Sequence, residues 1–446
     1  MTTTLAAAGP LPQRRILQTW WPLAASWLLM SFEQPMANAI VARLAEPEIN
    51  LAAWGSIVFP LSLIVEAPII MLLAASTALS RDWESYRWLR RAMMILGATL
   101  TALHLLVALS PLYYVVVRGL IGAPAETIEP ARLGLILMVP WSWSIGYRRF
   151  NQGVLIRFGH SRAVGIGTLV RLGSEVLMLA AGYLVGTIPG TVVAGAAIAV
   201  GVMSEALYTG LRVRPVLRDQ VRPALPSGET LSLGQFLHFY IPLSMTSILY
   251  LLVQPIGSAA LSRMPEALGS LAVWPVVSGL LFLFRSLGMA YNEVVVALLD
   301  QPRAAGALRR FALGLAALTT GGMLLVAATP LATLWFGAVS GLQESLVELA
   351  RSAFWLVLPV PGLNVLQSWF QGTIVHSQRT RGVTEAVVVF LLVSVAIQWA
   401  GVAWGGVTGL YVGVAAFAVG YLVQTAWLWW RARPALAAAQ GPDIHL

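Results

Sequence analysis

The sequence contains no cysteine and no lysine, and only 11% of its 446 residues are charged. Without cysteine the chain can form no disulfide, thiolate nucleophile or cysteine-ligated metal site, and its redox compartment stays unspecified. A soluble globular chain averages about 25% charged residues, so this chain has too few polar side chains to cover a water-soluble fold. The composition therefore excludes an ordinary soluble domain.

Motifs for soluble catalysis are also missing. The sequence has no G-x-x-x-x-G-K-[ST] loop, no H-E-x-x-H and no G-x-S-x-G. These motifs hold nucleotide phosphates, a catalytic zinc ion and a serine nucleophile, respectively. We therefore expect no enzyme, no catalytic residues, no metal site and no cofactor. Any transport would then be driven by an ion gradient or by the substrate gradient.

Long apolar runs fill the chain instead, and 58% of the residues are hydrophobic. A run of 18 or more apolar residues can cross a hydrocarbon layer of about 30 Å as a helix. We predict an all-α polytopic membrane protein. Its twelve transmembrane helices are expected at 16–44, 50–79, 92–117, 131–156, 163–186, 190–211, 235–263, 270–299, 311–337, 348–375, 383–403 and 407–430.

The formal charge of +9 indicates membrane orientation rather than a nucleic-acid partner. With no lysine, all 28 basic residues are arginine, and most lie in loops on the side of the N-terminus. Positively charged loops stay in the cytoplasm, where they contact lipid headgroups. We expect a multi-pass protein of the cell inner (plasma) membrane, with membrane lipids as partners and both termini in the cytoplasm.

The second half of the sequence repeats the first at a shift of 220 residues, which becomes 219 once one residue is removed within the second pair of matched spans, 50–79 and 270–299. The matches include Gln34-Pro35 with Gln254-Pro255, Arg43 with Arg263, Trp54 with Trp274, Arg90-Arg91 with Arg309-Arg310, and Gln152-Gly153 with Gln371-Gly372. We expect a six-helix bundle at 1–211, a cytoplasmic linker at 212–234 and a second six-helix bundle at 235–446.

Six spans per half give the two copies one orientation, related by a pseudo-two-fold axis along the membrane normal. Parallel repeats of this kind are a transporter architecture, with the substrate bound between the halves near the midplane. Alternating access would follow from rocking one half against the other. Gene duplication also builds channels and inert bundles, so a bundle without transport is the alternative.

The six-plus-six parallel repeat resembles the MOP superfamily, which includes multidrug and toxin extrusion (MATE) transporters, lipid II flippases and O-antigen flippases. Phe32-Glu33-Gln34 with Asn38, and Gly153-Val154-Leu155-Ile156 leading into Gly159-His160-Ser161, are similar to its progressive ankylosis branch. The likeness in topology covers nearly the whole chain, whereas the likeness in motifs covers only patches of the first half. The resemblance implies export of a small anion such as citrate, pyrophosphate or a nucleotide.

Ionisable residues inside membrane spans are costly, so they are functional candidates. Glu33 lies in the middle of the first span, and Pro35 cannot donate a hydrogen bond to the Ser31 carbonyl. This predicts a kink beside a carboxyl group. We expect Glu33, Gln34, Pro35 and Asn38 to serve proton or sodium coupling, or gating. The alternative is a kink that only lets two helices pack.

Arg285 is the strongest candidate for binding an anion, because a guanidinium forms bidentate bonds with carboxylate or phosphate. The repeat counterpart of Glu66 is Arg285 or Ser286, depending on where the second half loses one residue. An ion pair of Arg285 with Glu66 or Glu293 is the alternative to anion binding. We place Asn292 in the binding site, and Glu66 and Glu293 among the coupling or gating residues.

Two polar stripes complete the predicted binding site. Arg148, Arg149 and Gln152 would line a cytoplasmic vestibule of the fourth span, unless the arginines only reach the headgroups. Asn364, Gln367 and Gln371 share one face of the tenth span, as a cavity wall or as interhelical hydrogen bonds.

Two further groups of charges are less informative. Arg171 and Glu175 lie four residues apart on the fifth span and can neutralise each other, so we expect a structural role. Glu205 stands alone in the sixth span and carries no assignment.

Together these features predict a secondary active transporter that exports a small anion by alternating access, with protons or sodium ions as coupling ions. One chain supplies both halves of the site, so a monomer is sufficient. The rivals are a flippase for a lipid-linked headgroup, a proton- or sodium-coupled multidrug exporter, a membrane enzyme acting on a lipid, and a scaffold without transport.

Overall fold

A computed structural model describes residues 11–225, 231–301, 303–377 and 381–440. Both ends of the chain and residues 226–230 of the predicted linker lie outside this description. Within the described residues, eight helices are long and apolar enough to cross a membrane, or ten if each of two bent pairs is one span. The predicted all-α polytopic membrane protein is confirmed.

The helices of the first half follow the first six predicted spans. They are α1 (Gln13–Ser31), α2 (Glu33–Val41), α3 (Pro47–Leu51), the π-helix η1 (Ala52–Val58), α4 (Phe59–Ile70), α5 (Leu72–Leu79), α6 (Trp83–Leu109), α7 (Leu112–Tyr114), the π-helix η2 (Val115–Ile121), α8 (Ala125–Leu137), α9 (Val139–Arg157), α10 (Ser161–Val185), α11 (Gly190–Val216) and the π-helix η3 (Leu217–Val221). The first span is interrupted at Phe32, one turn before Pro35, so the predicted kink is present.

The second half has the same order of spans, built from fewer separate helices. They are α12 (Leu233–Leu261), α13 (Ala267–Met289), α14 (Tyr291–Leu298), α15 (Ala304–Ala328), α16 (Leu331–Thr333), the π-helix η4 (Leu334–Val339), α17 (Glu344–Leu356), α18 (Val360–His376), α19 (Arg381–Trp404) and α20 (Gly409–Gln440). The third and ninth spans end at Leu109 and Ala328, before the predicted ends at 117 and 337. Pro111 and Pro330 follow these ends and start separate short helices, because proline cannot continue a helix.

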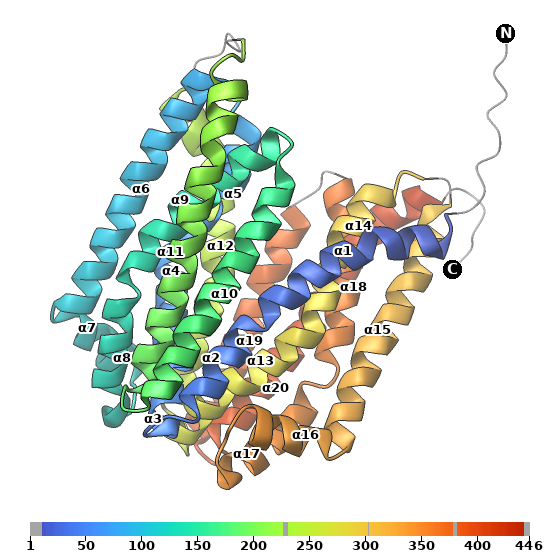
Figure 1. Cartoon of the computed structure of the whole chain (residues 1–446). Helices are drawn as coiled ribbons and strands as arrows, with labels where there is room; N and C mark the ends of the chain where they lie inside the picture. Colours follow the sequence, from blue (N-terminus) through green and yellow to red (C-terminus); the bar gives the residue numbers. More distant parts are fainter. Residues whose placement is uncertain (1–10, 226–230, 302, 378–380, 441–446) are drawn as a thin grey trace.

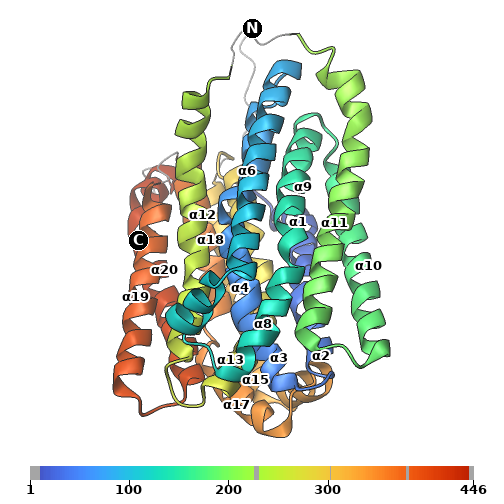
Figure 2. The same ribbon diagram turned by 90° about the vertical axis from the view of Figure 1, so that its left-hand side faces the viewer.

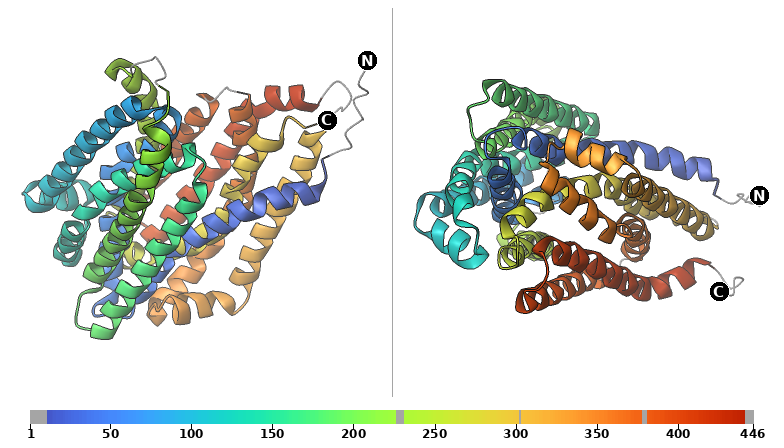
Figure 3. Two further views of the ribbon diagram at one scale, coloured as in Figure 1. Left: turned by 45° about the horizontal axis from the view of Figure 1, so that its top comes forward. Right: turned by 90° about the horizontal axis from the view of Figure 1, so that it is seen from below.

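The two halves lie side by side, and the described ends of the chain, the start of α1 and the end of α20, lie toward the upper end of the second half in Figure 1. We call this end the terminal side; it is the side predicted to be cytoplasmic. Helix α1 points away from the first half and lies against the second half (Figures 1 and 3). There the Trp20 indole donates to the Leu287 carbonyl at 3.0 Å. Helix α12 crosses the other way, and its Tyr240 hydroxyl donates to the Pro68 carbonyl on α4. The division of the chain at 212–234 stays a prediction.

The repeat found in the sequence is also a repeat in packing. A Cβ atom on Gly153 would lie 2.6 Å from the Leu73 carbonyl oxygen. A Cβ atom on Gly372 would lie 3.0 Å from the Asn292 carbonyl oxygen. A shift of 219 therefore relates Gly153 to Gly372, and it also relates Leu73 to Asn292, the residues against which these glycines pack.

One extra residue of the first half explains the change from 220 to 219. Helix η1, Ala52–Val58, is a π-helix, whose hydrogen bonds hold more residues per turn than those of an α-helix. The extra residue thus fits within η1, before α4 begins. At the shift of 219 that applies after η1, the counterpart of Glu66 is Arg285.

The halves touch closely on the side opposite the termini. Pro275 packs against Gly55, where any Cβ atom would overlap the proline ring. The Asn38 amide donates to the Pro275 carbonyl at 3.2 Å, and the Ser56 hydroxyl donates to the Leu271 carbonyl at 2.6 Å. The space between the halves is therefore closed on this side.

Candidate functional site

Two cavities lie between the halves, on the terminal side of these contacts. The inner cavity, of about 370 Å³, is lined by Ser31, Glu33, Gln34 and Phe59 of the first half and by Trp274, Ser278, Arg285 and Phe417 of the second, among others. The terminal-side cavity, of about 510 Å³, is lined by Trp27, Ile70 and Met71 of the first half and by Tyr250, Arg285, Asn292, Glu293, Asn364, Gln367, Gln371, Tyr421 and Gln424 of the second, among others. Arg285 lines both cavities.

Arg285 is buried at 8% exposure, and tyrosine hydroxyls surround its guanidinium. Its Nη2 donates to the hydroxyl of Tyr421 and, at 3.4 Å, to that of Tyr250. The guanidinium carbon lies 4.8 Å from the ring centre of Tyr421. Among the described residues, Arg285 forms no ion pair with a carboxylate, so the alternative pairing with Glu66 or Glu293 is not formed.

This arrangement leaves a buried positive charge without a negative partner from the described part of the chain. An arginine side chain stays charged in proteins, and burying a charge is costly unless it is paired. The Nε atom of Arg285 is buried and has no hydrogen-bond partner among the described residues. An anion in either cavity would supply the missing charge and the missing acceptor.

Amide side chains line the terminal-side cavity beside Arg285. Asn292 and Asn364 each have a buried side-chain oxygen without a hydrogen-bond partner among the described residues. The Gln367 amide donates to the Tyr421 carbonyl at 3.1 Å and to the Thr425 hydroxyl at 3.0 Å, so it holds α18 against α20. These two oxygens accept hydrogen bonds and cannot bond an anion, so any bond from the asparagines to an anion would come from their amide NH2 groups.

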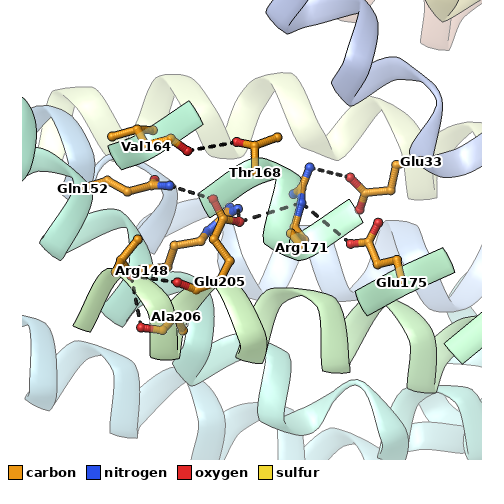
Figure 4. Close-up of polar contacts among 10 residues, drawn as sticks. Glu33, Arg148, Gln152, Val164, Thr168, Arg171, Glu175, Glu205 and Ala206 are labelled. Atoms are coloured by element: carbon orange, nitrogen blue, oxygen red, sulfur yellow. Dashed lines mark hydrogen bonds and ion pairs between the residues drawn. The ribbon is translucent and has the colours of Figure 1, made fainter. Parts of the chain in front are cut away.

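A second polar group lies inside the first half (Figure 4). Arg171 on α10 pairs with Glu33 on α2 at 2.7 Å, and it lies 3.7 Å from both Glu175 and Glu205. Arg148 on α9 pairs with the same Glu205 on α11. These five residues, which we call the charge cluster, join four helices of the first half.

The charge cluster reaches the inner cavity through Glu33. That side chain is 14% exposed and lines the cavity, whereas the side chains of Glu175 and Glu205 are only 1% exposed. Helices α10 and α11 make room for the buried carboxylates with glycines: a Cβ atom on Gly201 would lie 2.6 Å from Glu175 Oε1. Protonation of Glu33 from the cavity would therefore remove the negative charge that pairs with Arg171.

The predicted binding residues fall in two places. The residues of the second half gather around the terminal-side cavity: Arg285, Asn292, Asn364, Gln367 and Gln371. Those of the first half do not join them. Arg148 and Gln152 bind Glu205, and Arg148 is 5% exposed, so it does not reach the headgroups. Arg149 has a buried Nε atom without a hydrogen-bond partner among the described residues.

The predicted coupling or gating residues are also spread over the fold. Gln34 lines the inner cavity with Glu33, whereas Asn38 belongs to the closed side. Pro35 packs near Gly279 of the second half, where a Cβ atom would lie 3.2 Å from the proline ring. Among the described residues, no group of three or more His, Asp or Glu side chains is placed to hold a metal ion.

Glu66 and Glu293 occupy different surroundings. Glu66 is 1% exposed in the first half, close enough to feel the charges of Arg148 and Arg149. Both of its carboxylate oxygens are buried without a hydrogen-bond partner among the described residues. Glu293 instead lines the terminal-side cavity.

The sequence assigned no role to Glu205 and did not single out Tyr250 or Tyr421, although a signal for the pairing of Glu205 was present. At the shift of 219, Arg148 corresponds to Gln367 and Glu205 corresponds to Gln424. Both charges of the buried pair are thus replaced together by neutral amides in the second half. A paired loss of charge of this kind indicates contact between the two positions.

Comparisons with known proteins show similarity in structure but not in sequence. No family model matches the chain, and no curated protein matches it. An inward-facing MATE family transporter of the MOP superfamily has a TM-score of 0.75 at 15% identity, covering 95% of this chain and 99% of that chain. An outward-facing MATE structure has a TM-score of 0.67 at 17% identity, covering 96% and 97%, respectively.

A third similar structure is a MOP superfamily transporter from Pyrococcus furiosus Vc1, with a TM-score of 0.63 at 16% identity, covering 96% of this chain and all of that chain. It is described as having a binding pocket of reverse polarity that suggests a different function. The chain thus has the fold of MATE transporters of the MOP superfamily, as its sequence predicted. The closer resemblance to the progressive ankylosis branch stays a prediction.

Proposed function

We propose that this chain, which has the fold of MATE transporters, is a secondary active transporter that exports a small anion of the citrate, pyrophosphate or nucleotide class. The observation that carries the proposal is Arg285. It faces both cavities between the halves, and among the described residues it has tyrosine hydroxyls but no carboxylate beside it. Asn292 and Asn364 line the same cavity and would complete the binding site by donating hydrogen bonds from their amide NH2 groups to the anion.

The arrangement of the halves supports alternating access. The contact of Gly55 with Pro275 closes one side, and the cavities lie on the other. In our proposal this is the form that loads substrate from the cytoplasm, with the terminal side facing the cytoplasm of a cell whose inner membrane holds the protein. Rocking the halves would open the opposite side and release the anion.

Coupling is assigned to the charge cluster. Glu33 lies between the inner cavity and Arg171, so it can exchange its guanidinium partner for a proton or a sodium ion from the cavity. Loss of that ion pair would free α2 from α10 and change how the first span holds the halves. Arg148 and Gln152 would support Glu205 in this process rather than bind substrate.

A multidrug exporter is the second candidate, because two of the similar structures belong to a multidrug resistance MATE family transporter. A cationic drug would have to bind beside the unpaired positive charge of Arg285, which opposes it. A flippase for a lipid-linked headgroup would use the same positive charge but would need a lateral opening. No chemical step is assigned to any residue, and one chain contains every part of the proposed site.

The test is flux from proteoliposomes that hold the purified protein and labelled citrate, pyrophosphate or ATP, with and without a pH gradient. We expect protein-dependent efflux of at least one anion, and its loss in Arg285→Ala. The matched control is Arg351→Ala, which removes an arginine that is 42% exposed and, among the described residues, paired with Glu348 at the surface. Efflux of cationic dyes, but of no anion, would assign the multidrug function instead.

A further inference from the structure

A third cavity lies outside the space between the halves. It has a volume of about 220 Å³ and is bounded by α6, α9, α11 and η3 at the terminal side of the first half. Figure 2 shows α9 between α6 and α11 on the outer face of this half. Both outer helices pack against α9 but hardly against each other, so α9 forms the floor of this groove.

The groove carries the chemistry of an anion site. Arg90 on α6 and Arg214 on α11 line it, and both are exposed, without a carboxylate partner among the described residues. Tyr86 and Tyr147 add hydroxyl groups, and Asn151 on the floor has a buried amide nitrogen without a partner among the described residues. Among the described residues that line the groove, none is acidic.

In the first half, a glycine makes room for this groove. A Cβ atom on Gly210 would lie 2.6 Å from the Tyr147 hydroxyl, so the glycine lets the tyrosine stand there. At the shift of 219, the positions of Gly210 and Asn151 are occupied by Trp429 and Phe370 in the second half. Phe370 is buried among apolar side chains there. The groove is thus not a general consequence of arginines at helix ends.

Exposed apolar side chains follow the groove residues on the same two helices, nearer the membrane interior. On α6, Met94 lies one turn beyond Arg90 and is 36% exposed. On α11, Leu211 and Leu207 lie one and two turns beyond Arg214, at 49% and 66% exposure. A ligand with a phosphate at the level of the arginines and acyl chains below it would match both parts.

We propose that this groove binds the phosphate group of an acidic phospholipid from the leaflet on the terminal side. The two guanidinium groups would hold the phosphate oxygens through charge-assisted hydrogen bonds, and Tyr147 and Asn151 would add neutral donors. The acyl chains would lie over Leu207 and Leu211. The site is separate from Arg285 and does not depend on the proposed transport function.

The test measures the binding of short-chain phosphatidylglycerol to the full-length protein in detergent, from its effect on the thermal unfolding temperature. Short-chain phosphatidylcholine and inorganic phosphate serve as comparison ligands. The variant is Arg90→Gln with Arg214→Gln. The control is Arg309→Gln with Arg433→Gln, which removes the repeat-equivalent arginines of the second half. Tyr147→Phe is a milder variant that removes only a hydroxyl group.

We expect phosphatidylglycerol to bind at least about tenfold more weakly to the first double variant, since charged hydrogen bonds are among the stronger ones. The control variant should bind like the wild type, and Tyr147→Phe should weaken binding by a smaller factor. Equal weakening in both double variants would overturn the proposal, because it would indicate general charge attraction. Binding of inorganic phosphate at this site without any preference for phosphatidylglycerol would overturn the assignment to a lipid.

Discussion

Arg43 and Arg263, which the repeat relates to each other, each reach across to the opposite half. Arg263 donates to the carbonyls of Leu120 at 2.8 Å and Ile121 at 2.7 Å, at the end of η2. Arg43 donates to the Ala338 carbonyl in η4. A positive charge near the carbonyl end of a helix is favourable, so each arginine fastens one half to the other on the closed side.

The glycines that end these π-helices are also equivalent. Gly122 and Gly341 have φ angles of 72° and 74°, which side-chain-bearing residues rarely adopt. A Cβ atom on Gly122 would lie 3.2 Å from the Arg263 guanidinium, and one on Gly341 would lie 2.9 Å from that of Arg43. The chain thus builds the same interhalf contact twice.

Removing both arginines should open the side opposite the termini. Each exposed, charged hydrogen-bonding group contributes on the order of 1 kcal/mol, so Arg43→Ala with Arg263→Ala should shift the ratio of closed to open forms by roughly tenfold or more. Because the chain has no cysteine, spin labels can be attached at Glu126→Cys and Ser345→Cys without other changes. The distance distribution between these labels should gain a longer component.

Arg118→Ala is the matched control for that experiment. Arg118 lies in η2 and is exposed. Its removal should leave the label distances unchanged. An unchanged distribution in the double variant as well would show that Arg43 and Arg263 do not hold the closed side.

The buried ion pair of Arg148 and Glu205 should stabilise the folded protein against thermal unfolding. Removing one member of a buried ion pair costs about 3–5 kcal/mol when it leaves the other charge unpaired. In Arg148→Gln the cost is below that range, because Glu205 keeps Arg171 at 3.7 Å and the Gln152 amide at 2.8 Å. Arg148→Gln alone should still lower the thermal unfolding temperature more than Arg351→Ala, whose exposed pair is worth at most about 1 kcal/mol. The double variant Arg148→Gln with Glu205→Gln should recover most of the loss, because the second half carries two glutamines at these positions. No recovery would mean that the charges serve something beyond their mutual pairing.

Neutralising Glu33 should abolish the effect of a pH gradient on transport without abolishing transport itself. Glu33→Gln imitates a permanently protonated carboxyl and removes the 2.7 Å ion pair, while Arg171 keeps Glu175 and Glu205 as neighbours. We expect downhill exchange of the anion to persist and acceleration by a pH gradient to disappear in proteoliposomes. Glu348→Gln, an exposed change, should keep both activities. A full response to the pH gradient in Glu33→Gln would remove Glu33 from the coupling role.

Much of the fold could be predicted because apolar length and matched prolines, glutamines, tryptophans and arginines are direct features of the sequence. Glu33 and Arg285 could be found as charges in the middle of apolar spans. The pairing of Arg171 with Glu33 could not be predicted. Spacing along one helix identifies Glu175 as a neighbour of Arg171, but it does not identify a carboxylate on another helix. Contact with Glu33 depends on how α10 is rotated against α2.

The tyrosines beside Arg285 illustrate the same limit. Tyr250 and Tyr421 lie 171 residues apart and are common residue types for an apolar helix. Only the packing of α12 and α20 around α13 brings both hydroxyl groups to one guanidinium. Among the described residues, the lack of a carboxylate partner for Arg285 is likewise a property of the packed helices, and it argues against the ion pair with Glu66 or Glu293.

The most direct test of the anion site is equilibrium binding of the labelled anion to the purified protein, compared among wild type, Arg285→Lys and Arg285→Gln. Binding needs no coupling ion and no motion of the halves, so it isolates the site. We predict measurable binding in the wild type, weaker binding in Arg285→Lys because a lysine keeps the charge but not the bidentate geometry, and none in Arg285→Gln. Unchanged binding in Arg285→Gln would contradict the account.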